Sequence, residues 1–481
     1  MRKRSNVIEF FTFLVFVLTC IAWVAPASSS QPKPISLHPD NSHYLLFRGK
    51  PTILITSGEH YGAVLNLDFD YVTYLDELKS HGLNLTRTFS GTYREVPSSF
   101  GITDNTLAPK RYCSPWLRSS TPGAVDGDKF DLTKWNDSYF NRLRDFVLQA
   151  SGRGVVVEFV LFCPFYDDNL WNVNPMKYTN NINNIGDCPR TEVYTLKHQD
   201  LLKIHDAFVR KAVAELNSFD NLYFEICNEP YFGGVTEDWQ AHIAQTIADA
   251  EKNLPNKHLI AQNIANGVKK IDKPNSIVSI FNFHYAVPPD TVAQNYHLNK
   301  VIADDETGFR GKDDVTYRTE GWGFIIAGGA VYSSLDYSFT PAHPAGTLRD
   351  YKSPGGGSSE LRDQLGILLR FMESFDFLRM SPNNNPIKGG WITAPLGGTP
   401  AQANATVRVL AESGKAYAIY INGGTEANLT LDIPAGNYTT EWLNTKTSKI
   451  DKTEKLTHKG GNVTLRSPEY VEDIALRLLS Q

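Results

Sequence analysis

The chain has 481 residues, of which 41% are hydrophobic, 12% aromatic and 21% charged, so it can bury a large core and is neither disordered nor a coiled coil. At about 150 residues per domain, this length predicts about three domains, or two if one of them is a barrel. The formal net charge is −5 and no run of Lys or Arg follows residue 4. Nucleic acid is therefore not an expected partner, because phosphate neutralisation needs a basic surface.

Residues 1–27 have the pattern of a secretory leader. Basic residues at positions 2–4 precede an apolar run from residue 10 to residue 24, and Ala25-Pro26-Ala27 follows as an A-x-A-type cleavage site. About 15 apolar residues are short for a membrane span of about 20. We therefore expect a signal peptide that is removed, and a secreted, periplasmic or cell-surface protein that is not held in a membrane.

Four cysteines follow the leader, namely Cys113, Cys163, Cys188 and Cys227. In an oxidising compartment an even number of cysteines makes one or two disulfides possible, and the spacing indicates no particular pairing. The spacings are wide and no C-x-x-C occurs, so we expect no structural zinc site. No cofactor is expected.

Residues 35–380 alternate between short apolar β-branched runs and longer amphipathic stretches, which is typical of a parallel sheet wrapped by helices. Strands are predicted at residues 52–57, 83–89, 154–162, 221–227, 258–263, 277–283, 300–304 and 329–334. Helices are predicted at residues 70–81, 136–153, 198–217, 239–253, 317–327 and 360–375. Eight strands, each followed by a crossover, predict an α/β fold of the (β/α)8 barrel type.

The pattern changes towards the C-terminus. Residues 403–481 contain short alternating strands separated by Gly, Asn and Pro, which predict a β-sandwich domain. Residues 381–402 are rich in Pro, Gly and Asn and are predicted to be a linker or a packed junction. Because this segment lacks the long Ser/Thr tracts of flexible linkers, we expect the sandwich to pack against the barrel.

Candidate catalytic residues are sought at the C-terminal ends of the strands, where a parallel barrel builds its site. The fourth strand ends with Asn228 and Glu229, and the seventh ends with an acidic run that closes at Glu306. A buried unpaired carboxylate costs several kcal/mol, so these residues indicate a function more than a core position. The alternative for Glu229 is a helix N-cap. Glu320 falls on a predicted helix and is expected to be a helix-face carboxylate.

Two carboxylates on facing strand ends suit hydrolysis of a glycosidic bond, in which one protonates the leaving oxygen and the other attacks the anomeric carbon or activates water. Arg87 ends the second strand, and His284 and Tyr285 end the sixth. Together with Asn228-Glu229-Pro230 and Glu306, these residues resemble clan A of the retaining glycoside hydrolases over residues 40–380.

The resemblance implies roles for the residues that match. Glu229 would be the acid/base, Glu306 the nucleophile, Asn228 a ligand of the sugar 2-hydroxyl, and Arg87 a partner that orients the nucleophile. The charge of the nucleophile should raise the pKa of the acid, while Arg87 should keep the nucleophile ionised. Clan members commonly carry His-x-Tyr on the sixth strand and a Trp at the end of the eighth. Here His284 and Tyr285 are adjacent, and the eighth strand lacks a Trp.

The chain resembles more specifically the cellulase-like barrels whose C-terminal β-sandwich has been provisionally labelled a collagen-binding domain. Other strand-end residues are expected to contact a sugar through carboxylates or aromatic faces, with loop packing or capping as the alternative. They are Glu59, His60, Tyr166 and Trp171.

These patterns together predict a secreted retaining hydrolase of O-glycosidic bonds in an oligosaccharide or polysaccharide. The alternative is a barrel that binds carbohydrate or acts as a scaffold without catalysis. The sugar, the linkage, endo or exo action, and the oligomeric state stay open.

Overall fold

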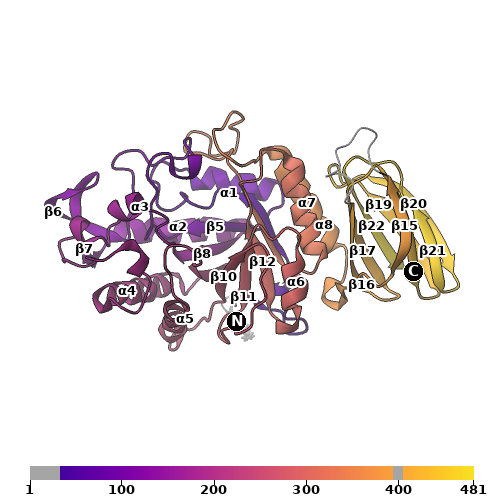
Figure 1. Ribbon diagram of the computed structural model, residues 1–481, viewed down its shortest axis with the longest axis horizontal. Coiled ribbons are helices and arrows are strands. Elements are labelled where there is room, and N and C mark those ends of the chain that lie inside the picture. Colours follow the sequence, from indigo (N-terminus) through magenta and orange to yellow (C-terminus); the bar gives the residue numbers. More distant parts are fainter. Residues whose placement is uncertain (1–32, 394–404) are drawn as a thin grey trace, which may run out of the picture. The chain divides into compact units, whose positions relative to one another are not determined.

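The computed structural model describes residues 33–393 and 405–481, so the predicted leader lies outside the described residues. Within them, eight parallel strands form one sheet in the order β4-β13-β12-β11-β10-β9-β8-β5 (Figure 1). The strands are β4 (Leu54–Gly58), β5 (Leu85–Phe89), β8 (Val156–Phe162), β9 (Leu222–Cys227), β10 (Ile260–Asn266), β11 (Ile280–His284), β12 (Val301–Glu306) and β13 (Val331–Leu335). Nearly all of their residues are buried, because barrel strands pack on both faces. The predicted barrel fold is confirmed.

The barrel closes between β4 and β5 around the side chain of Asn84. The backbone N–H of Asn84 donates to the carbonyl of Ile55 at 3.3 Å. Its Nδ2 donates to the carbonyl of Ile53 at 2.8 Å, and its Oδ1 accepts from the N–H of Ile55 at 2.9 Å. One amide side chain therefore supplies hydrogen bonds between the first and second barrel strands.

Helices cover the outside of the sheet (Figure 1). They are α1 (Tyr71–Ser80), α2 (Asp137–Arg153), α4 (Gln199–Leu216), α5 (Glu237–Glu251), α6 (Asp290–Asn295), α7 (Asp314–Ile326) and α8 (Ser359–Glu373). Asp70, Asn136, Thr236 and Ser358 cap α1, α2, α5 and α8 with side-chain oxygens, which satisfies N–H groups that lack a partner in the helix. Within the described residues, the crossover from β10 to β11 contains no helix.

Three parts of the barrel domain were not anticipated from the sequence. A small antiparallel sheet of β1 (Ser36–Leu37), β2 (Leu45–Phe47) and β3 (Lys50–Thr52) precedes the first barrel strand. The long insertion after β5 contains a hairpin of β6 (Trp116–Ala124) and β7 (Gly127–Trp135). The loop after β8 contains a short helix, α3 (Asp168–Asn172).

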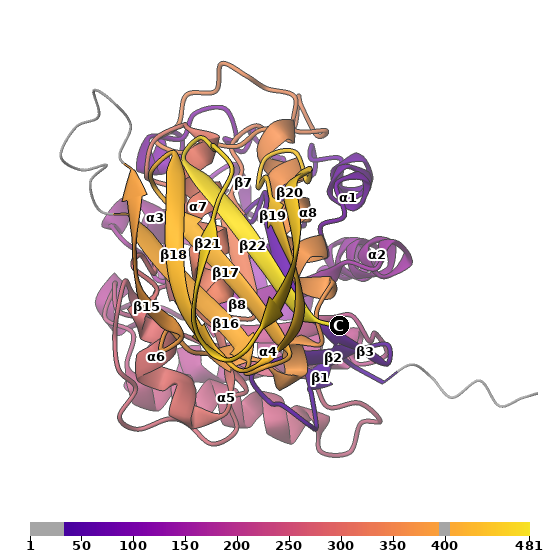
Figure 2. The same ribbon diagram turned by 90° about the vertical axis from the view of Figure 1, so that its right-hand side faces the viewer.

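The C-terminal region forms two antiparallel sheets within residues 381–393 and 405–481, shown in Figure 2. Their strands are β14 (Ser381–Pro382), β15 (Ile387–Thr393), β16 (Thr406–Glu412), β17 (Ala416–Asn422), β18 (Glu426–Ile433), β19 (Gly436–Leu443), β20 (Ile450–His458), β21 (Gly461–Arg466) and β22 (Asp473–Ser480). Within the segment expected to be a linker or packed junction, β14 and β15 pair with β16 and β18. The Pro and Gly residues of this segment interrupt the alternating pattern from which its strands could have been predicted.

The second domain packs on helix α7 of the barrel. The ring of Trp322 stacks on that of Tyr420, with centroids 5.4 Å apart. The guanidinium of Arg318 pairs with the carboxylate of Asp473 at 2.8 Å, and both side chains are buried. A buried ion pair and an aromatic stack hold the two domains together, as expected from the composition of the junction.

The cysteines of the described residues, Cys113, Cys163, Cys188 and Cys227, are all free thiols. The possibility of one or two disulfides among them is therefore not realised in this structure. A search of the described helices for a stretch long and apolar enough to cross a membrane finds none.

Candidate active site

Glu229 and Glu306 lie together at the C-terminal edge of the barrel. Glu229 follows β9 directly, and Glu306 is the last residue of β12. One oxygen of each carboxylate and one ring nitrogen of His284 lie within 4.8 Å of one another. The backbone φ of Glu229 is +36°, a left-handed conformation that costs a residue other than glycine about 1–3 kcal/mol and is concentrated at functional sites.

Arg87 connects three of the residues at this site. Its Nη1 donates to Glu306 at 2.9 Å and its Nη2 donates to Asn228 at 2.6 Å. Its Nε and Nη2 form a bidentate pair with Glu225 at 2.9 and 3.0 Å. The guanidinium is only 1% exposed, so its fork of donors holds Glu306 and Asn228 in a fixed geometry. This is the place that the sequence resemblance implied for Arg87.

Tyrosine hydroxyls surround Glu229. Tyr166 donates to one oxygen of Glu229 at 2.6 Å, and Tyr231 donates to the other at 3.3 Å. The amide of Asn228 donates to the hydroxyl of Tyr166 at 2.9 Å. Tyr231 was missed by sequence reasoning, although it comes only two residues after Glu229.

Glu306 has different partners. The hydroxyl of Tyr285 donates to it at 3.2 Å, and Nε2 of His60 lies 3.8 Å away. Tyr285 has a backbone φ of +53°, which turns the chain directly after β11. Both residues therefore contact the carboxylate of Glu306, whereas the sequence predicted them as contacts of the substrate.

His284 lies between the two carboxylates. Its Nδ1 is 3.3 Å from Glu229 and 3.6 Å from Glu306, and its Nε2 is 3.4 Å from Asp305. Burial by itself would lower its pKa, but Glu306, Glu229 and Asp305 together raise the pKa of His284 to about 9. The imidazole is therefore protonated at neutral pH.

The positive charge of His284 affects the pKa values of both carboxylates. Burial opposes the ionisation of Glu229, but the hydrogen bond and charge of His284 lower its pKa to about 2. Burial, with the charge of Glu229, raises the pKa of Glu306. The sequence argument expected the nucleophile to raise the pKa of Glu229, whereas the hydrogen bond and charge of His284 lower it.

A second layer of carboxylates lies beneath the site and was not found from the sequence. Glu158 of β8, Glu225 of β9 and Asp305 of β12 bring oxygens within 4.8 Å of one another, and none is more than 1% exposed. Burial raises the pKa of Glu158 well above its usual range and that of Glu225 to about 7. Glu158 and Glu225 could have been found from the sequence, because each lies inside an apolar run, GVVVEFVLF and NLYFEIC respectively.

Two residues expected to contact substrate have hydrogen-bond partners within loops. Glu59 accepts hydrogen bonds from the N–H groups of residues 61, 62 and 63 at 2.7, 2.5 and 3.1 Å, so it closes its own loop. Trp171 is 1% exposed and donates its indole N–H to the carbonyl of Cys188 at 3.1 Å, so it belongs to the core of a loop. Glu320 lies on α7 and pairs with Arg310 at 2.7 Å.

The remaining candidates line or adjoin one pocket of about 430 Å3. Its walls include His60, Tyr166, Asn228, Glu229, Tyr285 and Glu306. His284 and Arg87 lie behind these residues and contact them through the hydrogen bonds and ion pairs described above. The cluster thus combines two carboxylates, two cations and several hydroxyl donors around a space open to a ligand.

Carboxylate and imidazole atoms this close together are also of the type that binds metal ions. Here, however, the guanidinium of Arg87 and the imidazolium of His284 already compensate the negative charge. A metal cation would have to displace or neutralise them. The donor set therefore fits acid-base and nucleophilic chemistry better than metal binding.

Solved structures share this fold. A protein from Bacteroides vulgatus ATCC 8482, provisionally described as a glycoside hydrolase, is similar with a TM-score of 0.66 at 13% identity, over 95% of this chain and 84% of its own. Another, named a glycoside hydrolase, has a TM-score of 0.62 at 13% identity, over 93% and 97% of the two chains. A glycoside hydrolase family 5 structure from Bacteroides vulgatus ATCC 8482 has a TM-score of 0.60 at 14% identity, over 93% and 94%.

These likenesses cover both the barrel and the C-terminal sandwich. They confirm the expected fold, a (β/α)8 barrel followed by a β-sandwich. No protein-family model matches the sequence, and no curated protein matches it either.

Proposed function

We propose that this protein is a retaining glycoside hydrolase that cleaves O-glycosidic bonds in two displacement steps. The observation that carries the proposal is the pair Glu229 and Glu306, on strand ends β9 and β12, with oxygens within 4.8 Å. Retaining enzymes hold their carboxyl groups about 5–5.5 Å apart, whereas inverting enzymes need about 6.5–9.5 Å to admit a water. The short separation supports retention of the anomeric configuration.

The contacts of each carboxylate support its role. Glu306, held by Arg87 and Tyr285, attacks the anomeric carbon, and the bond to the leaving oxygen breaks. Glu229 delivers a proton to that oxygen and afterwards removes one from the water that releases the sugar. Asn228, whose Oδ1 and Nδ2 are oriented by Arg87 and Tyr166, binds a sugar hydroxyl.

The surroundings of the pocket support an oligosaccharide or polysaccharide as substrate. Exposed aromatic side chains lie at its walls or beside Glu229, and apolar ring faces stack on the C–H faces of sugars. They are Phe100, Tyr231, Phe232 and Phe309, all between 37% and 44% exposed.

The proposal is tested by incubating the purified protein with nitrophenyl glycosides and with plant and microbial polysaccharides. Proton NMR of the first-formed product should show the same anomeric configuration as the substrate. An inverted product would contradict the two-step mechanism. A protein that binds these polysaccharides in affinity electrophoresis but releases no sugar from any of them would instead be a carbohydrate-binding barrel.

A second expected result concerns pH. Glu229 and His284 titrate as a pair, and this pair retains one proton up to the pKa of His284, about 9. The falling limb of kcat/KM should therefore lie near pH 9. In His284→Gln, Glu229 must hold the proton alone, and the limb should move down by at least about two pH units, towards the ordinary range of a carboxyl group. His242→Gln on α5, remote from the site, is the control, and an unmoved limb in His284→Gln would contradict the pairing.

The protein is further proposed to be exported, with residues 1–27 removed on the way. The basic start, the short apolar run and the Ala25-Pro26-Ala27 site support this proposal. N-terminal sequencing of the mature protein should find a chain that begins after residue 27.

A further inference from the structure

Strand β12 contains a β-bulge near its C-terminal end. Against β11, Phe283 pairs with Asp304 and His284 pairs with Glu306, so Asp305 is an extra residue without a partner on that strand. Successive residues of a regular strand point to opposite faces, and a bulge shifts this alternation and redirects a side chain. Here both Asp305 and Glu306 face the interior of the barrel.

These two carboxylates contact the same two cations. Glu306 lies 2.9 Å from Nη1 of Arg87 and 3.6 Å from Nδ1 of His284. Asp305 lies 3.6 Å from Nε of Arg87 and 3.4 Å from Nε2 of His284. In a regular strand with Glu306 in the site, the preceding carboxylate would point away from it. The bulge therefore places a second carboxylate of β12 beside the ring of His284.

The contacts of Asp305 direct one of its oxygens towards His284. Asn282 of β11 donates from Nδ2 to Oδ2 of Asp305, and the Nε atom of Arg87 lies beside the same oxygen. The other oxygen, Oδ1, faces Nε2 of His284. Asn282 and Asp305 are both buried. The carboxylate of Asp305 is thus held in place by the barrel itself.

Both ring nitrogens of His284 face carboxylate oxygens. Nδ1 faces Glu229 and Glu306, and Nε2 faces Asp305. A neutral imidazole has a proton on one nitrogen and a lone pair on the other, so one side of the ring would then direct a lone pair at a carboxylate. The doubly protonated ring suits both sides. This geometry agrees with the charge effect of the three carboxylates, which raise the pKa of His284 to about 9 although burial opposes them.

We propose that Asp305 is a positioning residue that acts through His284. Its carboxylate retains the proton on Nε2 and fixes the plane of the ring, so that Nδ1 also carries a proton towards Glu229. The proton shared by Glu229 and His284 then stays on this pair at alkaline pH. This inference deepens the proposed hydrolase function and rests on it only where activity is measured.

Other titratable groups face Asp305 or His284. Glu158 brings an oxygen within 4.8 Å of Asp305, but burial raises the pKa of Glu158 well above its usual range, so it carries no charge at neutral pH. Asp304 accepts from the N–H of Ala286 at 3.4 Å, and burial likewise raises its pKa well above the usual range. The remaining groups are His60, Arg87, Tyr223, Glu225, Glu229, Tyr231 and Glu306.

The protonation of His284 is measured directly by an NMR titration of the nitrogen-15-labelled protein, in which its signals are those absent from His284→Gln. In the wild type both ring nitrogens should carry protons at pH 7 and titrate with a midpoint near pH 9. Asp305→Asn should lower the midpoint by at least about one pH unit, the effect of one neighbouring opposite charge. Asp304→Asn is the matched control, because it removes an adjacent buried carboxyl group that carries no charge, and it should leave the midpoint unchanged.

The same variants separate positioning from a merely structural role. In Asp305→Asn the falling limb of kcat/KM should move to lower pH together with the midpoint of His284, because the pair with Glu229 loses its proton at lower pH. Structural damage alone would lower kcat/KM at every pH and leave the limb near pH 9. Asp304→Asn should keep the limb of the wild type.

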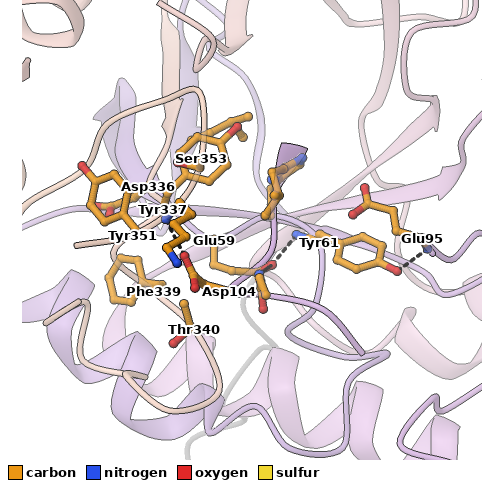
Figure 3. A pocket seen from close by; sticks show the side chains of 16 residues that line it. Glu59, Tyr61, Glu95, Asp104, Asp336, Tyr337, Phe339, Thr340, Tyr351 and Ser353 are labelled. Carbon is orange, nitrogen blue, oxygen red and sulfur yellow. Dashed lines mark hydrogen bonds between the residues drawn. The ribbon is translucent and has the colours of Figure 1, made fainter. Parts of the chain in front are cut away.

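Another carboxyl group titrates near this range at the rim of the pocket. Burial, with the charges of Glu59 and Glu306, raises the pKa of Glu95 to about 8. Figure 3 shows Glu95 in a cavity beside the pocket, where its backbone N–H donates to the hydroxyl of Tyr61 at 2.5 Å. Glu95→Gln removes this ionisation and should leave the NMR midpoint of His284 unchanged.

A wild-type His284 that is neutral at pH 7 overturns the inference before any variant is made. So does an unchanged midpoint in Asp305→Asn, or a midpoint that falls equally in Asp304→Asn. Should Asp305→Asn not fold, Asp305→Ser removes the same charge with a smaller side chain and takes its place. If the wild-type protein cleaves no glycoside, the hydrolase proposal fails, while the NMR titrations still decide whether Asp305 keeps His284 charged.

Discussion

Glu306→Ala should slow hydrolysis of every glycoside by at least about 10⁴-fold, because the variant lacks the nucleophile and no neighbouring group replaces it. Azide should restore turnover, since the small anion can occupy the vacated face of the sugar. The glycosyl azide formed in this way should have the inverted configuration. Proton NMR of the product measures both the rescue and its stereochemistry.

Glu229→Ala should lose activity to an extent that depends on the leaving group of the substrate. Dinitrophenyl glycosides need little protonation of the leaving group and should keep activity, whereas substrates with poor leaving groups should lose about 10²–10⁴-fold. Azide should here yield the glycosyl azide of retained configuration. Glu320→Ala is the matched control, because Glu320 lies on α7 and pairs with Arg310. If the two rescue patterns were exchanged, or if Glu320→Ala abolished activity, the assigned roles would be wrong.

Arg87→Met should lower the free energy of unfolding by about 3–5 kcal/mol at pH 8, since removal of one partner leaves buried carboxylates without a counter-ion. Arg87 contacts Glu225, Glu306 and Asn228 and is almost fully buried. The same change should remove most activity, because Glu306 loses the donor that fixes it. Denaturant unfolding and kcat/KM are the measurements.

The stability loss should depend on pH in a defined direction. The pKa of Glu225 is about 7 even beside Arg87, and it should rise further in the variant. A carboxyl group whose folded pKa exceeds its unfolded value reduces stability as pH increases from the unfolded pKa to the folded one. The defect should thus be smallest near pH 5 and largest above pH 8. Arg379→Met, an exposed residue paired with Asp376, should cost at most about 1 kcal/mol. A defect that grew towards pH 5 would contradict this account.

Much of the barrel could be predicted because its signals are local. Runs such as GVVVEFVLF and NLYFEIC alternate with amphipathic segments, and each predicted barrel strand overlaps an observed one. Strand ends also locate Glu229, Glu306, Arg87, His284 and Tyr285, because parallel strands bring their C-terminal ends to one edge. The hairpin at 116–135 and the strands β14 and β15 were not predicted, because bulges, Gly and Pro interrupt their alternation of apolar and polar residues.

Contacts within the site depended on side chains that are distant in sequence. Arg87 and Glu306 are 219 residues apart, yet they share a hydrogen bond. The reversal of the expected pKa order arises from His284, whose charge is itself set by three carboxylates from two other strands. Electrostatic energies depend on distances of a few ångströms in a medium of low dielectric, which no sequence spacing specifies.

The sequence by itself determined the barrel, the sandwich after it, and the pair of strand-end carboxylates, because hydrophobic period and strand order are properties of the chain. It could not separate residues that face the pocket from those that are buried within a loop, such as Trp171. The tertiary structure alone decided this. Loop conformation directs each of these side chains, and loop conformation follows from long-range packing and hydrogen bonds that a local pattern does not encode.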